Sequence, residues 1–157
     1  MIDPEKLMRL AIEKAREGLD AGQSPFGCAI ARGDELLAVE HNTVVASIDI
    51  TAHAEVNALR VACKNADAII LADCVVATTC EPCPMCMAAL HWARVSRVYY
   101  GASIADAEEA GFNELQVPAA DVLKIGRSKV ILEANLLSDE CRELFQLWKQ
   151  RPDKVVY

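Results

Sequence analysis

Residues 78–86 read TTCEPCPMC and begin in a short β-branched run, residues 74–79, that suits a buried strand. Pro82 interrupts the strand at a place where a helix beginning at Cys83 accepts a proline. Cys83 and Cys86 are three residues apart and therefore share one helix face, as two thiolates must to bind one tetrahedral ion. A helix amino terminus also lowers the pKa of a thiol, which favours the metal-binding thiolate. The stretch therefore predicts a strand, a sharp turn and a helix that presents two metal ligands.

A second stretch, residues 51–55, reads TAHAE and opens a predicted helix over residues 52–65. His53 would complete a set of three ligands and leave a fourth position for water, whose pKa zinc lowers from about 15.7 to about 7. Glu55 could then take a proton from that water, deliver it to a ring nitrogen and help to protonate a departing amine. Because residues two apart diverge on a helix, His53 and Glu55 can converge only at the helix tip. The sequence thus predicts one catalytic Zn²⁺ with Glu55 as the proton shuttle.

Two other interpretations of these cysteines stay open at this point. Cys80, Cys83, Cys86 and His53 could form a closed structural zinc site with no water position. Cys83 and Cys86 could also be a redox pair, although a redox pair would not explain His53 and Glu55. Glu55 by itself could be an ordinary glutamate of a first helical turn.

The rest of the chain alternates between strand and helix patterns. We expect a helix from Asp3 to near Gly22, strands over residues 26–32 and 35–39 joined by a turn, a loop over residues 41–51, strands over residues 97–102 and 129–132, and a last helix from Ser138. Strands separated by helices imply a mixed sheet covered on both faces. No repeat or linker is visible, so residues 1–157 are expected to form one domain, with residues 150–157 as a tail.

Composition narrows the class of protein further. With 157 residues, 53% hydrophobic and 25% charged, the chain is typical of one globular domain. The first residues, MIDPE, lack the features of a secretory signal, and no apolar run is long enough to span a membrane. An odd number of cysteines, seven, favours reduced thiols, so we expect a cytoplasmic protein. The net charge of −7 disfavours nucleic acid as a partner, because phosphate binding depends largely on lysine and arginine.

The two motifs together resemble the signature of zinc-dependent deaminases, His-x-Glu followed by Pro-Cys-x-x-Cys. On these residues the chain is identified as a member of the cytidine deaminase superfamily. The resemblance implies an α/β fold, a three-layer α/β/α sandwich with a five-stranded mixed sheet, in which zinc-activated water attacks an amidine-like ring carbon.

Within the superfamily, the chain most resembles bacterial guanine deaminases. The resemblance rests on QSPFG at residues 23–27, Asn42, HWAR at residues 91–94 and AEEAGF at residues 107–112. It implies water attack at C2 of guanine, which gives xanthine and ammonia. The substrate-binding residues that it implies are Asn42 and Phe26, backbone amides near Ala54 and Cys83, and Trp92, Glu114 and Tyr157. It also implies a homodimer in which the tail reaches over the partner's active site.

One departure bears on the substrate. Asn113-Glu114 stands where the family has a pair of aspartates, so Glu114 would read the base with one extra methylene. Another aminated ring therefore stays open as the substrate. The alternatives are a tRNA adenosine deaminase, a cytosine or cytidine deaminase and, outside the enzymes, a structural zinc-binding interaction domain.

Overall fold

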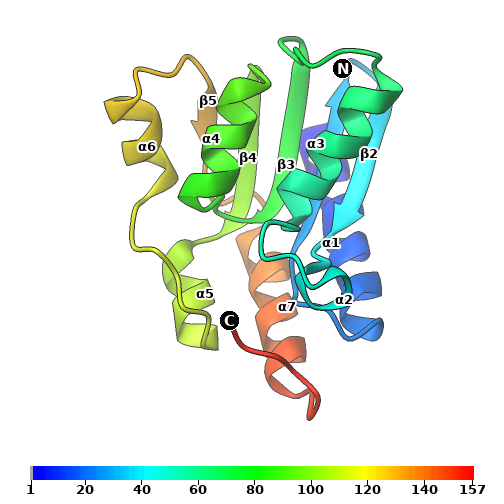
Figure 1. The fold of residues 1–157 in the computed structure, drawn as a ribbon, viewed down its shortest axis with the longest axis vertical. Helices are drawn as coiled ribbons and strands as arrows, with labels where there is room; N and C mark the ends of the chain where they lie inside the picture. Colours follow the sequence, from blue (N-terminus) through cyan, green and yellow to red (C-terminus); the bar gives the residue numbers. More distant parts are fainter. Residues whose placement is uncertain (1) are drawn as a thin grey trace.

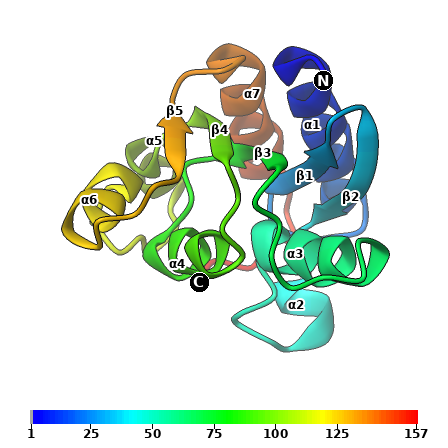
Figure 2. The same ribbon diagram turned by 90° about the horizontal axis from the view of Figure 1, so that it is seen from above.

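The computed structural model describes residues 2–157 and shows a five-stranded sheet between two layers of helices (Figure 1). Helices α1 (Pro4–Asp20) and α7 (Ser138–Lys149) cover one face of the sheet. Helices α3 (Ala54–Asn65) and α4 (Pro84–Trp92) cover the other face, as the view from above shows (Figure 2). The predicted three-layer α/β/α sandwich is therefore confirmed.

The sheet has the strand order β2-β1-β3-β4-β5 and mixes two kinds of pairing. Strand β1 (Gly27–Arg32) pairs antiparallel with β2 (Glu35–His41) and with β3 (Cys74–Cys80). Strand β4 (Arg97–Ala102) pairs parallel with β3 and with β5 (Ile131–Glu133). All residues of β3 are buried, because this central strand has helices on both faces. The chain leaves β3 at the edge of the sheet where α3 and α4 begin.

Side chains alternate along β3 between the two halves of the core. Val75 and Ala77 pack with α1 and α7, whereas Cys74 and Val76 pack with α3 and α4. Successive strand residues point to opposite faces, so one strand contributes to both layers. Thr78 falls on the α3 side by the same alternation, and this places its hydroxyl at the functional site.

The two motif helices begin later than the sequence pattern predicted. Helix α3 begins at Ala54 and α4 at Pro84, so His53 and Cys83 are the N-cap residues. Both have extended backbone, with φ and ψ of −65° and 157° for His53 and of −61° and 165° for Cys83. The change of direction at an N-cap lets His53 and Glu55 face one space although they are only two residues apart.

Three short helices were not predicted: α2 (Val44–Ser47), α5 (Ile104–Ala110) and α6 (Ala119–Ile125). Helix α2 interrupts the segment that was expected to be a loop over residues 41–51. Strand β1 begins at Gly27, so Phe26 precedes the strand in which it was expected. No helix within residues 2–157 is both long and apolar enough to span a lipid bilayer.

Candidate active site

A cavity of about 390 Å³ lies where β3 ends and where α3 and α4 begin. Its volume falls in the range of small-molecule sites, roughly 300–1,000 Å³. The residues that line it are Phe26, Asn42, Ile50, His53, Glu55, Cys80, Glu81, Cys83, Pro84, Met85, Phe112, Asn113, Glu114, Leu115 and Tyr157. Both motifs therefore meet at one concave site.

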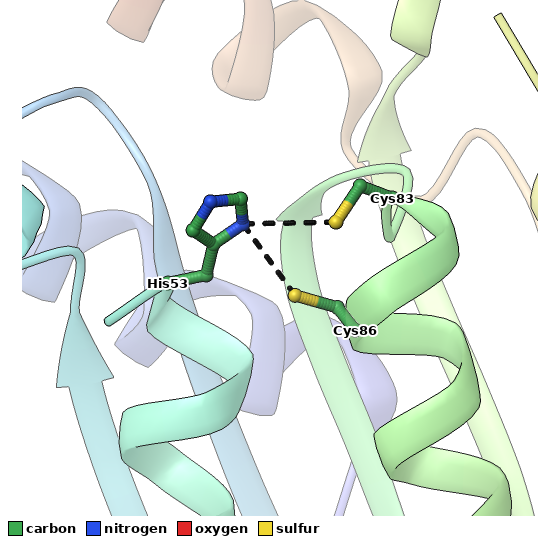
Figure 3. A group of neighbouring side chains, drawn as sticks. All are labelled: His53, Cys83 and Cys86. Carbon is green, nitrogen blue, oxygen red and sulfur yellow. Dashed lines mark hydrogen bonds between the residues drawn. The ribbon is translucent and has the colours of Figure 1, made fainter. Parts of the chain in front are cut away.

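The three predicted ligands converge at this cavity (Figure 3). His53 Nδ1 lies 3.7 Å from Cys83 Sγ and 3.5 Å from Cys86 Sγ. Tetrahedral zinc with bonds of about 2.0–2.1 Å to nitrogen and about 2.3 Å to sulfur requires a nitrogen-to-sulfur separation of about 3.6 Å. The donor set and its spacing thus fit Zn²⁺, which is the cofactor of this site.

Cys83 and Cys86 differ in acidity because the Cys86 thiol donates a hydrogen bond to the sulfur of Cys83. A hydrogen bond from the Cys86 thiol lowers the pKa of Cys83 to about 4, and His53 adds to the effect against the opposing influence of burial. The pKa of Cys86 is raised, because its thiol donates to Cys83 and is buried. The lowered pKa of Cys83 favours its thiolate, which is the form that binds metal.

Residues 2–157 place no fourth histidine, cysteine or carboxylate ligand beside this set. Within the described residues, the group of metal-capable side chains at this position comprises His53, Cys83 and Cys86 alone. Cys80 lies on the cavity wall, with its Sγ 3.5 Å from the carbonyl oxygen of Ser103. A closed site with Cys80 as the fourth ligand is thereby contradicted.

Glu55 lies beside the three ligands and is 6% exposed. Its Oε1 accepts a hydrogen bond of 2.8 Å from Thr78 Oγ1, which fixes the direction of the carboxylate. Burial raises the pKa of Glu55, and the negative charge of the Cys83 thiolate raises it further. A buried carboxyl with one fixed oxygen can accept a proton and return it.

Asn42 is buried in the cavity wall, as expected for a substrate-binding residue. Its Oδ1 accepts a 3.0 Å hydrogen bond from the Val44 N–H, and its Nδ2 donates a 2.8 Å hydrogen bond to Tyr157 Oη. These two bonds fix the orientation of the amide.

Three aromatic rings, those of Phe26, Phe112 and Tyr157, line the same cavity as Asn42. Phe26 packs edge-on against Phe112, with ring centroids 5.0 Å apart, and Tyr157 packs edge-on against Phe112 at 5.7 Å. The Asn113 N–H also donates to the carbonyl oxygen of Tyr157 over 3.2 Å. The tail of the chain thus ends at the cavity of the same chain, and its last residue lies between α5 and α7 (Figure 1).

The other expected substrate-binding residues lie in different places. Glu114 is half-buried on the cavity wall, and burial raises its pKa. Ala54 is fully buried as the first residue of α3, between His53 and Glu55. Trp92 is 79% exposed and lies in a separate groove between α3 and α4.

The cavity does not include Trp92 for a simple geometric reason. Cys83 precedes the first residue of α4 and Trp92 is the last, which separates the two by roughly 13 Å along the helix axis. Trp92 therefore does not line this cavity of its own chain, and its contact with the substrate stays a prediction.

Asn57, which the sequence did not single out, ties together the loops that carry Asn42 and His53. Its Nδ2 is 3.0 Å from the carbonyl oxygen of His41, 2.9 Å from Thr43 Oγ1 and 3.3 Å from the carbonyl oxygen of Ala52. Asparagine in a helix gives no local signal for such long-range bonds. Thr78 was also missed, because nothing in its local sequence indicates its hydrogen bond to the distant Glu55.

A three-ligand zinc site, a buried carboxylate beside it and a three-layer α/β/α fold define a zinc-dependent deaminase. Residues 1–102 match the family model described as the cytidine and deoxycytidylate deaminase zinc-binding region. The chain belongs to this family, and its similarity to individual relatives extends beyond the matched region.

A guanine deaminase from Bacillus subtilis is 39% identical to this chain over 154 residues, which cover 98% of each chain. A solved structure of guanine deaminase from Nitrosomonas europaea is 28% identical, with a TM-score of 0.88, and the match covers 96% of this chain and 87% of that one. A tRNA-specific adenosine deaminase from Aquifex aeolicus is 34% identical over 98 residues, which cover 62% of this chain and 65% of its own length.

Proposed function

We propose that residues 1–157 act as one deaminase domain that converts guanine and water into xanthine and ammonia. The observation that carries this proposal is the buried Glu55 carboxylate beside the open set of His53, Cys83 and Cys86, at the wall of a cavity of ligand size. The full-length similarity to a guanine deaminase supports guanine as the base.

Glu55 is the proton carrier of the reaction. When bound, zinc lowers the pKa of water to about 7 and so supplies the nucleophile at neutral pH. Thr78 occupies Glu55 Oε1, which leaves Oε2 to accept a proton from the attacking water. Glu55 then passes this proton to the ring nitrogen next to C2. As the carbon-to-nitrogen bond breaks, Glu55 takes the second proton of the former water and delivers it to the departing amine, which leaves as ammonia.

The cavity wall offers contacts that suit a purine. Phe26 supplies an aromatic surface, while Asn42 and Glu114 supply polar groups for the edge of the base. Ala54 begins α3 between His53 and Glu55, and this position supports a role for its backbone amide beside the reacting centre. Sites with polar contacts discriminate between bases more strongly than apolar pockets do, because a wrong base leaves buried polar groups unpaired.

The charge of the cavity supports a free base as the substrate. The described residues that line it include three carboxylates, Glu55, Glu81 and Glu114, and neither lysine nor arginine. A phosphate group close to these carboxylates would be repelled, so nucleotides and tRNA are disfavoured.

We also propose a homodimer in which residues 150–157 can exchange between subunits. Lys154 Nζ donates to the carbonyl oxygens of Lys149 and Arg151, each over 3.2 Å, and Tyr157 reaches Asn42 and Asn113. The tail is thus anchored at its two ends, and the tail of a second copy could make the Tyr157 contacts. A cytoplasmic location suits this protein, because all seven cysteines are free thiols and the zinc site needs reduced sulfur.

One assay tests the substrate directly. The purified zinc-loaded protein is offered guanine, adenine, cytosine, their nucleosides and tRNA in parallel, and ammonia release is measured for each. We expect turnover with guanine and little with the other compounds. Turnover of a different compound with guanine inert would overturn the substrate, and no ammonia from any compound would favour a non-catalytic zinc domain.

A further inference from the structure

Glu81 lies between the last residue of β3 and the metal-binding Cys83, and it is half-buried on the cavity wall. The main chain of Glu81 is fixed to the sheet, because its N–H donates a 2.8 Å hydrogen bond to the carbonyl oxygen of Ala102 at the end of β4. The side chain of Glu81 starts from a rigid position as a result.

The two carboxylate oxygens of Glu81 accept hydrogen bonds from the first residues of two different helices. Oε2 accepts a 3.2 Å bond from the Ile104 N–H, which begins α5. Oε1 accepts a 2.9 Å bond from the Ala119 N–H, which begins α6. One side chain thereby holds two elements that are separated by residues 111–118.

That intervening segment carries part of the cavity wall, namely Phe112, Asn113, Glu114 and Leu115. Most of its own backbone bonds are short-range, such as the Glu114 N–H to the Phe112 carbonyl oxygen at 3.0 Å, and its one long-range bond, from the Asn113 N–H, goes to the carbonyl oxygen of Tyr157 in the tail. Such local turns shape the segment without fixing it to the metal-binding loop. Glu81 supplies a direct link between the segment's two flanks and that loop.

The two helices depend on Glu81 to different degrees. Helix α5 has its own capping box, in which Ser103 Oγ accepts from the Asp106 N–H and Asp106 accepts from the Ser103 N–H. Helix α6 is preceded by Pro118, which has no side-chain group to cap it, and Glu81 accepts the N–H of its first residue instead. Loss of Glu81 should therefore loosen α6 more than α5.

From these contacts we infer that Glu81 is a positioning residue: it fixes residues 111–118 relative to the metal-binding loop and so holds Glu114 where the base binds. Its effect is on affinity for the base rather than on zinc binding or on the proton transfers of Glu55. The inference rests on the proposed function in one respect, because it takes the base as the ligand of Glu114.

Glu81→Gln is the sharpest test, since glutamine keeps the size of the side chain but can accept only one of the two hydrogen bonds. Removing a hydrogen bond to a charged group should raise KM for guanine by roughly tenfold while kcat changes little. Zinc content should remain one ion per chain. The amide of Ala119 should exchange its hydrogen markedly faster, and the amide of Ile104 less so. The matched control is Glu109→Gln on the exposed side of α5, which should change none of these quantities.

Two double variants show whether Glu81→Gln changes KM through residues 111–118. If Glu81 acts through Glu114, adding Glu81→Gln to Glu114→Gln should raise KM little beyond the value for Glu114→Gln alone. Pro118→Ser should partly restore KM in the Glu81→Gln background, because its backbone is already extended, with φ and ψ of −56° and 140°, and serine can cap α6.

An unchanged KM, a loss of zinc, or a full additional loss in the Glu114→Gln background would each overturn the inference. So would a Pro118→Ser double variant that is as impaired as Glu81→Gln. Hydrogen exchange separates this inference from the proposed function. If the wild-type protein releases no ammonia from guanine, the proposed function fails. The exchange rate of the Ala119 amide in Glu81→Gln then still decides whether Glu81 holds the segment.

Discussion

The Thr78 hydroxyl decides which oxygen of Glu55 is available to the substrate, because it donates to Oε1 over 2.8 Å. Thr78→Val keeps a branched side chain of similar size but removes this donor. We expect kcat to fall by roughly tenfold, the scale of one lost hydrogen bond to a charged group, with zinc content unchanged. Steady-state kinetics together with metal analysis checks this expectation. A variant with wild-type kcat would show that Glu55 is oriented by other contacts.

Glu55→Gln separates catalysis from metal binding at the same site. Glutamine preserves the shape of the side chain but cannot accept and return a proton, so turnover should fall by about 10²–10⁴-fold. The three zinc ligands are untouched, and zinc should stay bound. Ammonia release measures catalysis and zinc content measures metal binding, and both are determined on the same sample. Retained turnover would contradict a catalytic role for Glu55.

The residues that sequence reasoning found are those that lie close together in the chain. His53 and Glu55 are two residues apart, Cys83 and Cys86 are three apart, and the chemistry of each pair is visible in a short window. The partners of the site were missed because they depend on long-range geometry. Thr78 contacts Glu55 across 23 residues of sequence and Glu81 contacts Ala119 across 38, and only the strand register and helix placement bring them together.

Strand β4 and helix α7 approach closely at Gly101. A Cβ atom added there would overlap Cys141 Sγ and would lie 2.7 Å from Cys141 Cβ and 3.1 Å from the Leu136 carbonyl oxygen. Gly101→Ala should therefore lower the free energy of unfolding by about 1–3 kcal/mol, the usual range for overpacking. Denaturant unfolding measures the change.

A second substitution tests the cause of that loss. Because the sulfur is the nearest atom to the added methyl group, Cys141→Ala in the Gly101→Ala background should recover part of the lost stability. Cys141→Ala alone gives the reference value. If the two losses simply add, the clash with the sulfur is not the cause.

The long elements were predictable because their apolar residues repeat at helix or strand spacing, and the short ones were not. Ser103 and Asp106 form a capping box at the start of α5, so the sequence does contain a local signal for this helix. Helix α6 has no such local capping signal, because Pro118 cannot cap it and the N–H of its first residue, Ala119, bonds to the distant Glu81. Trp92 was placed in the cavity by resemblance, but its position at the far end of α4 keeps it outside.

At the scale of the molecule, zinc should contribute to folding as well as to chemistry. His53 and the two cysteines come from two separate helix starts, so one ion links α3 to α4. A ligand that binds only the folded state at about 1,000 times its Kd adds about 4 kcal/mol of stability. Removal of zinc with a chelator should therefore lower Tm by several degrees, and added zinc should restore it. An unchanged Tm would show that the ion is not needed to join the two helices.

The tail should matter for turnover, because Tyr157 contacts both Asn42 and Phe112 at the cavity. Deletion of residues 155–157 should reduce kcat/KM by at least tenfold, since it removes a wall of the site and the partner of the Asn42 amide. Tyr157→Phe, which removes only the hydroxyl, should have a smaller effect. Turnover that survives the deletion in full would count against any role of the tail.

Mixed subunits distinguish a tail that acts in its own chain from an exchanged one. A chain without residues 155–157 has an intact Glu55, whereas a Glu55→Gln chain has an intact tail. If tails exchange, unfolding and refolding the two together should give mixed dimers with restored activity. If each tail serves its own cavity, as in the single chain described here, the mixture should stay as weak as its components.

Tyr157 also sets a practical limit on how this protein can be handled. Its carbonyl oxygen accepts the Asn113 N–H and its ring packs against Phe112, so any residues appended after it would emerge at the cavity mouth. An affinity tag or a fluorescent fusion at that end would compete with incoming molecules for the same opening. Fusions belong at the other end of the polypeptide.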